Sequence, residues 1–229
     1  MRLLCVTDLH GATDVLERIL GDAGRVDGVL LGGDITSFGT PNSAEYIVRR
    51  VQREYECVWA VAGNCDSPSI DKRLVELGVS IFGRGAVSGD IGFYGVSAMP
   101  PWHGTMYELT EGEIATALET GFSQLGDRRW DVLLTHTPPR DTPLDRTWRG
   151  SHVGSTAVRE FIGRHPPHLL VCGHIHESRG TAQLGPTQMV NCGAAYEGHY
   201  ALVDLAEEIR VDLRSVAQEL AVCGRSAAS

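Results

Sequence analysis

The chain has 229 residues, and its 20 Lys and Arg against 29 Asp and Glu give a net charge of −9 with histidine neutral. A charge of this sign disfavours non-specific binding to a nucleic-acid backbone or to an anionic membrane, so we expect neither a nucleic-acid duplex nor a membrane as partner. Hydrophobic residues make up 42% and charged residues 21%, which excludes a disordered chain and favours a globular one with a sizeable core.

The location of the protein is predicted from its apolar runs and its cysteines. The first apolar run, residues 3–6, is too short for the core of a signal peptide. No stretch approaches the roughly 20 apolar residues of a membrane span. The cysteines are scattered rather than spaced as a disulfide framework, which favours free thiols in a reducing cytoplasm. They are Cys5, Cys57, Cys65, Cys172, Cys192 and Cys223.

Short apolar runs, bounded by Gly, Asp or Pro, alternate with amphipathic stretches along the first half of the chain. The runs are short and rich in β-branched residues, which favours buried strands. In chain order we predict a strand at 3–7, a helix at 14–20, a strand at 28–31, a helix at 44–54 and a strand at 57–62. Shorter strands follow at 79–82, 86–88 and 91–96, the last two joined by a hairpin turn at Gly89 and Asp90.

The second half continues this alternation before it changes character. We predict a helix at 112–125, a strand at 131–135, a helix at 154–164 that Ser155 caps, and a strand at 169–172. The runs at 187–190, 200–204 and 209–213 are expected to be antiparallel. The pattern predicts a layered α/β fold with much parallel sheet. We expect one domain over residues 1–216 and a frayed, Ala- and Ser-rich tail over 217–229.

Polar side chains follow five of the apolar runs, those at 3–7, 28–31, 57–62, 131–135 and 169–172. They are Asp8 and His10, Asp34, Asn64 and Asp66, His136, and His174 and His176. Ligands of open α/β sheets bind outside the carboxyl ends of the strands, so we expect these side chains to converge on one site. Any one of them alone is better explained as a helix cap, a turn residue or a loop histidine, and only their joint placement favours a site.

The residue types predict a metal centre. Carboxylate, imidazole and amide ligands suit Mn, Fe, Zn, Co or Ni. Without Asp66, the set comprises two carboxylates, four imidazoles and one amide. Seven such ligands are too many for one ion that keeps a position open for substrate, but they suit two divalent ions that share a carboxylate. Glycines at 32, 33, 63 and 173 allow the backbone to approach such a centre closely.

The ordered set of motifs resembles the signature of the calcineurin-like metallophosphoesterases. It comprises Asp8-x-His10, Gly33-Asp34, Gly63-Asn64-x-Asp66, His136 and Gly173-His174-x-His176. With the closing Asn191-Cys192-Gly193 and residues 200–204, the resemblance covers about nine tenths of the chain and points to the small stand-alone prokaryotic members of phosphodiesterase type.

This resemblance implies a four-layer αββα sandwich, with two mixed sheets flanked by helices and the metal site at the carboxyl ends of the strands. It implies that Asp8, His10, Asp34 and His176 hold the first metal, and that Asn64, His136 and His174 complete the second, with Asp34 bridging. The implied reaction is attack on phosphorus by a metal-bridging hydroxide, and manganese is the favoured metal.

One position departs from the family pattern. The third motif commonly reads Gly-Asn-His-Asp/Glu, with the His credited with protonating the leaving oxygen, but here the position is Cys65. A thiol with a pKa near ~8.5 is a poorer general acid at neutral pH than an imidazole near ~6.5. We therefore expect a preference for phosphodiesters or activated phosphoesters, unless another residue supplies the proton. Asp66 is expected to orient a ligand or to cap its loop.

Four further residues are candidate substrate contacts. His152 precedes a predicted helix start, where it could contact a phosphate or lie on the surface. Trp102 offers a stacking face, and His103 beside it belongs either to a substrate-covering loop or to a plain connection. Arg149, like Arg140 and Arg146, could contact phosphate, although basic residues mixed with Asp141 and Asp145 more often form a solvated face.

The predicted function is metal-dependent hydrolysis of a small phosphoester, with catalysis carried by Asp34, Asn64, Cys65 and Asp66. Two alternatives stay open: a phosphomonoesterase or protein phosphatase, and a non-catalytic metal-binding scaffold of the same fold. A nuclease is disfavoured because the chain has no basic stripe and no room for an extra capping domain. The sequence leaves homo-oligomerisation open.

Overall fold

Two mixed β-sheets form the framework of the computed structural model, which describes residues 1–217. The first sheet has the strand order β11-β10-β1-β2-β3, in which β1, β2 and β3 are parallel and β10 is antiparallel to both of its neighbours. Its strands are β1 (Arg2–Val6), β2 (Gly28–Gly32), β3 (Val58–Val61), β10 (His199–Leu205) and β11 (Ile209–Ser215).

The second sheet has the strand order β4-β5-β6-β7-β9-β8, with a parallel centre and an antiparallel strand at each edge. Its strands are β4 (Gly85–Ser88), β5 (Ile91–Val96), β6 (Trp130–Thr135), β7 (Leu169–Cys172), β8 (Gly180–Leu184) and β9 (Thr187–Asn191). The expected hairpin is present, since Ser88 pairs with Ile91 across Gly89 and Asp90.

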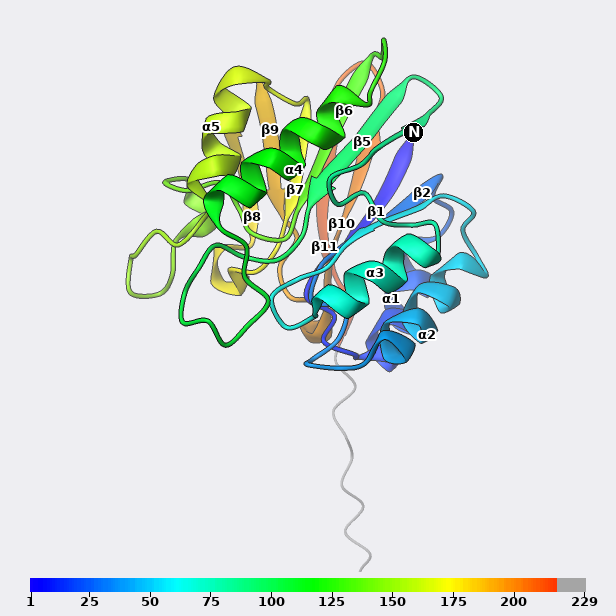
Figure 1. Ribbon diagram of the computed structural model, residues 1–229. Coiled ribbons are helices and arrows are strands. Elements are labelled where there is room, and N and C mark those ends of the chain that lie inside the picture. Colours follow the sequence, from blue (N-terminus) through cyan, green and yellow to red (C-terminus); the bar gives the residue numbers. More distant parts are fainter. Residues whose placement is uncertain (218–229) are drawn as a thin grey trace, which may run out of the picture.

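Helices cover the outer face of each sheet (Figure 1). On the first sheet lie α1 (Thr13–Ala23), α2 (Pro41–Gln52) and α3 (Pro68–Glu76), and on the second lie α4 (Glu111–Ser123) and α5 (Thr156–Arg164). Three apolar cores result, one between the sheets and one under each helical layer. The implied four-layer αββα sandwich is therefore confirmed.

Successive side chains of β1 alternate between two apolar cores, which shows how one strand belongs to two layers. Leu3 and Cys5 are buried in the core between the two sheets, whereas Leu4 and Val6 are buried in the core beneath α1 and its neighbours. Successive side chains of a strand point to opposite faces, so a strand that is covered on both faces is apolar throughout. The predicted strands are apolar runs rather than alternating ones for this reason.

The starts of α3 and α5 follow local capping rules, whereas α1, with Ala12 at its N-cap position, has no side-chain cap. Ser155 caps α5 as expected, because its hydroxyl accepts a hydrogen bond from the Val158 amide at 3.2 Å. Helix α3 was not predicted, although its start carries a clear signal. Ser67 caps it and Pro68 occupies its first turn, where a missing N–H costs nothing.

Two expectations about the strands need correction, and one strand was missed. Residues 79–82 are not a strand: single bridges connect Ser80 to Ala60 of the first sheet and Phe82 to Gly95 of the second. The runs at 200–204 and 209–213 are antiparallel as expected, but β9, at the predicted run 187–190, pairs in parallel with β7. Strand β8, the antiparallel partner of β9, was not predicted. A short polar strand such as β8 has no apolar run to mark it. The predicted fraying of residues 218–229 lies outside the described residues.

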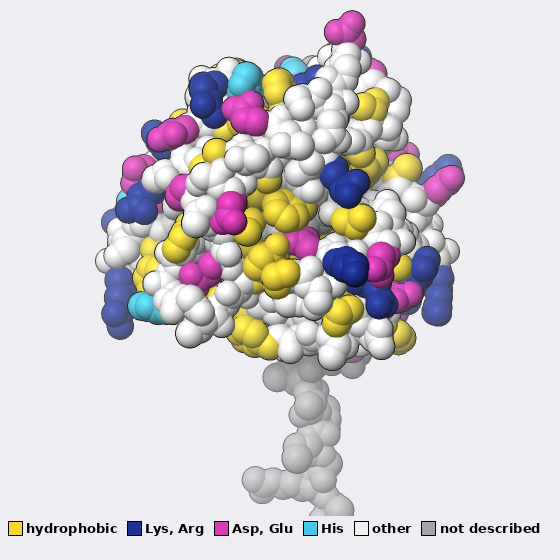
Figure 2. All heavy atoms as spheres, in the orientation of Figure 1, with side chains coloured by type: hydrophobic (Ala, Val, Ile, Leu, Met, Phe, Trp, Pro, Cys, Tyr) yellow, Lys and Arg dark blue, Asp and Glu magenta, His cyan; other side chains and the backbone are white. Residues whose placement is uncertain are grey.

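Acidic and basic side chains are interspersed over the face drawn in Figure 2, with hydrophobic side chains gathered near its centre. Among residues 1–217, no helix is both long and apolar enough to cross a membrane.

A buried carboxylate ties α3 to the second sheet. Asp71 accepts hydrogen bonds from the hydroxyls of Ser97, which follows β5, at 2.8 Å and of Tyr107 at 2.7 Å. Burial raises the pKa of Asp71 from 3.8 to about 6, against the opposing effect of these two hydrogen bonds. The folded protein therefore holds this proton more tightly than the unfolded chain does.

We expect Asp71→Asn to gain stability relative to the wild type as pH rises. Between pH 4 and 7.5 the unfolded carboxyl ionises first, so the wild type loses about 2 kcal/mol that the uncharged amide does not lose. Urea unfolding of both metal-free proteins at the two pH values measures this difference. Asp127→Asn, at an exposed position, is the matched control, and a pH-independent difference for Asp71→Asn would contradict the account.

Candidate metal centre

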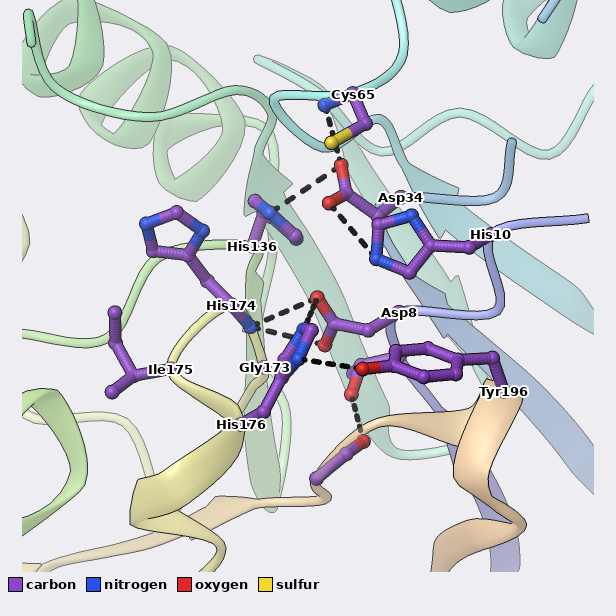
Figure 3. A network of polar contacts seen from close by, with 12 residues as sticks. Asp8, His10, Asp34, Cys65, His136, Gly173, His174, Ile175, His176 and Tyr196 are labelled. Carbon is purple, nitrogen blue, oxygen red and sulfur yellow. Dashed lines mark hydrogen bonds and ion pairs between the residues drawn. The ribbon is translucent and has the colours of Figure 1, made fainter. Parts of the chain in front are cut away.

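The carboxyl ends of strands from both sheets deliver polar side chains to one place (Figure 3). From the first sheet, β1 leads to Asp8 and His10, β2 to Asp34 and β3 to Asn64. From the second sheet, β6 leads to His136 and β7 to His174 and His176. The cluster therefore straddles the gap between the two sheets at their shared edge.

The loops that carry these side chains have an uncommon backbone. Asp8, His10, Asp34 and His174 have φ values of 55°, 50°, 47° and 66°, in the left-handed region that residues other than glycine seldom adopt. Hydrogen bonds between the loops hold them there: the Asp8 amide donates to Gly33 O at 3.0 Å and the His10 amide to Asp34 O at 2.8 Å. Strain of this kind gathers at functional sites, where it aims side chains.

Distances between potential ligand atoms fit a metal ion. His176 Nε2 lies 3.2 Å from Asp8 Oδ1, and Asp34 has His10 Nε2 3.5 Å from Oδ2 and His136 Nε2 3.6 Å from Oδ1. Atoms that bind one ion at about 2.1 Å are separated by roughly 3–3.5 Å. Three sets have ligand atoms within 4.8 Å of one another: Asp8, His10 and His176; His10, Asp34 and Cys65; and Asp8, Asp34 and His136.

His136 provides a second sign that a cation belongs here. Its Nδ1 faces Gly32 O at 3.0 Å and its Nε2 faces Asn64 Oδ1 at 2.7 Å, so both ring nitrogens face acceptors. A neutral imidazole has one N–H and satisfies only one of these contacts. Burial lowers the pKa of His136, but the charges of Asp34 and Asp8 outweigh burial and raise it. With the Asn64 oxygen turned toward Nε2, a proton or a metal cation fits between the two atoms, and with the amide reversed Nδ2 donates to Nε2.

Asp8 is held in its ionised form. Burial alone would raise its pKa, but the hydrogen bond from His176, the charges of His136 and His176, and the His174 amide lower the pKa to about 2. The same carboxylate accepts from the His174 amide at 3.2 and 3.0 Å. A fully buried anion of this kind is a strong ligand for a divalent cation.

His174 is placed differently from the other histidines. Its ring lies 5.0 Å from the His136 ring and points away from Asp8 and Asp34 in Figure 3. It belongs to none of the three ligand sets found among the described residues. Burial and then the charge of His136 lower its pKa to about 3, which keeps the imidazole in the neutral form that binds metals. Its role as a ligand stays a prediction.

Cys65 and Asp66 follow Asn64 but have different surroundings. The Cys65 amide donates to Asp34 Oδ1 at 2.7 Å, and its thiol belongs to the set with His10 and Asp34. Burial, and then the charge of Asp34, raises the pKa of this thiol. Asp66 accepts four hydrogen bonds, from the Ile35, Thr36 and Gly63 amides and the Thr36 hydroxyl, at 2.8–3.0 Å. It joins the loops after β2 and β3, and its oxygens do not belong to a ligand set.

Two glycines lie against the carboxylates. A Cβ atom on Gly63 would overlap the amide and carboxylate of Asp34, and one on Gly173 would overlap the carboxylate of Asp8. These close approaches place both acids within reach of side chains from the opposite sheet. Glycine is required at both positions because any larger residue would displace an acid.

Comparison with known proteins agrees with this geometry. The family model for calcineurin-like phosphoesterases matches residues 1–178. The chain belongs to the calcineurin-like phosphoesterase family. An uncharacterised protein of Methanocaldococcus jannaschii, MJ1162, is 32% identical over 198 residues, which cover 83% of this chain and 87% of that protein.

Solved structures of low sequence identity share the fold. The protein TT1561 of Thermus thermophilus has a TM-score of 0.74 at 18% identity, covering 93% of this chain and 98% of its own. A dimetal phosphatase from Danio rerio has a TM-score of 0.66 at 13% identity, covering 94% and 96%. These likenesses show that the sandwich fold is common to the set.

Sequence reasoning missed two residues of this calcineurin-like site. The Tyr196 hydroxyl lies 3.5 Å from His176 Nδ1, and its ring meets the rings of His10 and His176 edge to face. Asn191 donates to Leu144 O, Gly173 O and Ile175 O, and so holds the loop that carries His174 and His176. For Asn191, the Asn191-Cys192-Gly193 triplet of the family resemblance was a usable sequence signal. No sequence signal marks Tyr196.

A cavity of about 810 Å³ opens beside the metal centre. Asn64 and His174 line it from the metal side, and Trp102 and His152 line it as expected of substrate contacts. His103 and Arg149 are exposed and do not line the cavity. The sequence could not show whether either residue faces the cavity, because both belong to loops without a regular pattern. Arg140 lines the cavity instead.

We expect Gly63→Ala to weaken metal binding by about 10–100-fold, because the added methyl group displaces Asp34. Calorimetric titration with Mn²⁺ measures the affinity, and a thermal unfolding scan verifies that the variant folds. Gly21→Ala is the matched control, since a Cβ there meets nothing within 4 Å. Equal affinities for Gly63→Ala and the wild type would contradict this geometry.

Proposed function

We propose that this protein is a dinuclear, metal-dependent phosphodiesterase that hydrolyses small phosphodiesters or activated phosphoesters. The observation that carries the proposal is a buried Asp and His cluster with metal-ligand spacing, beside a cavity of about 810 Å³ that Asn64 and His174 line. Family membership supports phosphoester hydrolysis as the class of reaction.

Two ions fit the donor set better than one. Asp8, His10 and His176 form one set and Asp8, Asp34 and His136 another, so the two carboxylates stand between the two groups of imidazoles. Asp34 has one oxygen toward His10 and the other toward His136, which is the arrangement of a bridging ligand. The likeness to a dimetal phosphatase from Danio rerio supports the same assignment. Nitrogen and oxygen donors suit manganese, the favoured metal, as well as Fe, Zn, Ni or Co.

When bound, divalent ions lower the pKa of water and neutralise charge on phosphoryl oxygens. The chain contributes the frame for this chemistry. Asp8 and Asp34 are held by the His174 and Cys65 amides, which leave their other lone pairs directed to the centre. The Gly32 carbonyl accepts from His136 Nδ1 and thereby directs Nε2 to the centre.

The cavity favours a diester over a monoester. A monoester dianion calls for more positive charge than a diester monoanion. The Lys, Arg, Asp and Glu side chains that line the cavity are Arg140 and Glu111, of opposite sign, beside the imidazoles of His152 and His174. Its other walls include Met99, Trp102 and Met106, which suit an apolar or aromatic ester group. Cys65, in place of the family's histidine, removes one imidazole charge from the metal side.

The remaining predictions concern partners and location. A small phosphoester as partner, without nucleic-acid duplex or membrane, and a cytoplasmic location follow from the charge of −9 and the sequence patterns. They stay predictions, as does any homo-oligomer.

The proposed function is tested with a phosphoester panel: bis- and mono-p-nitrophenyl phosphate and 2′,3′- and 3′,5′-cyclic nucleotides, each with Mn²⁺, Ni²⁺ and Zn²⁺. We expect hydrolysis of diesters that a chelator abolishes and Mn²⁺ restores. Faster hydrolysis of monoesters would identify a phosphomonoesterase instead. Absence of activity with every divalent ion would identify a non-catalytic metal-binding scaffold.

We expect Cys65→His to raise the rate on p-nitrophenyl phosphate relative to its diester by about tenfold or more, because an imidazole adds a proton donor and positive charge beside Asp34. Steady-state kinetics on both substrates measure the ratio. Cys65→Ser is the matched control, since it adds neither feature. An unchanged ratio in Cys65→His would contradict the proposal that Cys65 causes the preference for diesters.

We expect Trp102→Ala to raise KM for aryl diesters about 3–10-fold with little change in kcat, because the ring lines the cavity and contributes binding rather than chemistry. Trp102 is 60% exposed, so its removal leaves no hole in the core. Trp148→Ala, which removes an 88% exposed ring outside this cavity, is the control. A fall in kcat at constant KM would contradict a binding role.

A further inference from the structure

A histidine–aspartate pair forms part of the cavity wall outside the metal cluster. His152 Nδ1 lies 2.6 Å from Asp145 Oδ1. The Asp145 side chain is fully buried, whereas the His152 side chain is 36% exposed and lines the same cavity as Asn64 and His174. The pair therefore connects a buried charge to the space in which a substrate of the metal centre would lie.

The sequence pattern, in which Asp145 is mixed with basic residues, suggested a solvated face. The structure instead shows that Asp145 is buried and anchors its loop. Its carboxylate accepts hydrogen bonds from the amides of Asp141, Thr142 and Gly154, each at 3.0 Å. Because these contacts require an acceptor, the fourth contact requires His152 Nδ1 to donate. Nε2 is then the ring nitrogen left free to act on a ligand.

The loop itself is closed at its base. The Arg140 amide donates to Ser155 O at 3.0 Å, and the Ser155 amide donates to Pro138 O at 2.9 Å. Within the loop, Arg146 pairs with His152 as an antiparallel bridge, and the Val153 amide donates to Asp145 O at 3.2 Å. A side chain on a frame of this kind keeps its geometry without help from a substrate.

We propose that His152 is the catalytic residue that protonates the leaving-group oxygen, with Asp145 as its positioning residue. The inference rests on the proposed phosphodiesterase function. The P–O bond to the leaving group breaks, its oxygen keeps the electron pair, and that oxygen takes the Nε2 proton of the imidazolium. Water supplies the oxygen of the new P–O bond, and the proton that the water loses restores the imidazolium.

Two observations favour this role over a simple phosphate contact. The Asp145 carboxylate accepts from His152 Nδ1 and fixes the ring so that Nε2 is free, which is how a carboxylate orients the histidine of other acid–base pairs. The family position that elsewhere carries the proton donor is Cys65, which lies on the metal side of the site. The other ionisable side chains that line the cavity are Arg140, Glu111 and His174. A guanidinium and a carboxylate are poor proton donors at neutral pH, and His174 is a predicted metal ligand.

The role makes a prediction that depends on the leaving group. Loss of a general acid slows expulsion of a poor leaving group by about 10²–10⁴-fold but barely affects a good one, which leaves without a proton. Loss of a phosphate contact slows all esters of the same phosphoryl group alike, because that contact is made with every one of them.

The experiment compares His152→Asn with the wild type on methyl aryl phosphates, whose leaving groups range from p-nitrophenolate to phenolate, and on a dialkyl phosphate, all with Mn²⁺. Asparagine retains an amide donor toward Asp145 and so preserves the loop. We expect kcat on the p-nitrophenyl ester to stay within about threefold and kcat on the phenyl and alkyl esters to fall at least about 100-fold. Asp145→Asn gives the same trend with a smaller amplitude.

Trp148→Ala, on the same loop and 88% exposed, is the control and keeps all rates. Equal losses on every ester would show a phosphate contact, and no loss would show no role; either result overturns the proposal. His152→Gln replaces His152→Asn if thermal unfolding shows that the latter does not fold. If the wild type hydrolyses no ester with any metal, the proposed function itself fails and this inference fails with it.

Discussion

Two buried carboxylates, Asp8 and Asp34, dominate the structure around the site. Both are almost fully excluded from solvent, and a buried negative charge is costly unless cations or N–H donors compensate it. The compensation comes from both sheets, through backbone amides and through imidazoles of His10, His136 and His176. The sandwich is suited to this task because the carboxyl ends of its parallel strands meet along one edge.

Holding the carboxylates requires a second ring of residues that would never touch a metal. Asp66 fastens the loops after β2 and β3, Asn191 fastens the loop after β7, and glycines let chain segments pass within contact distance of the acids. The left-handed backbone at four site residues is the visible strain. Stability is given up locally so that ligand atoms have fixed directions before any ion or substrate arrives.

In the proposed function, the cavity divides the chemistry between two sides. Asn64 and His174, the predicted metal ligands, line one side, and the loop anchored by Asp145 forms another; Trp102 and Met106 add apolar wall. Such a division allows charge on the phosphoryl group and charge on the leaving group to be handled by different residues. Cys65 on the metal side fits this division because the acid function need not lie there.

Apolar runs predicted a layered α/β fold with polar residues at the strand ends, and the family resemblance carried by the ordered motifs implied the αββα sandwich. This was feasible because strands buried on both faces and glycine-flanked Asp and His leave local patterns. The pairing of β9, the absence of a strand at 79–82, the orientation of the His174 ring and the separation of Arg149 from the cavity were decided only by tertiary contacts. Asp145 shows the limit most clearly. An Asp among arginines has the pattern of a solvated face. Its partners Asp141, Thr142, His152 and Gly154 belong to the same loop, and they surround the carboxylate only when the loop closes at its base, which no residue pattern shows.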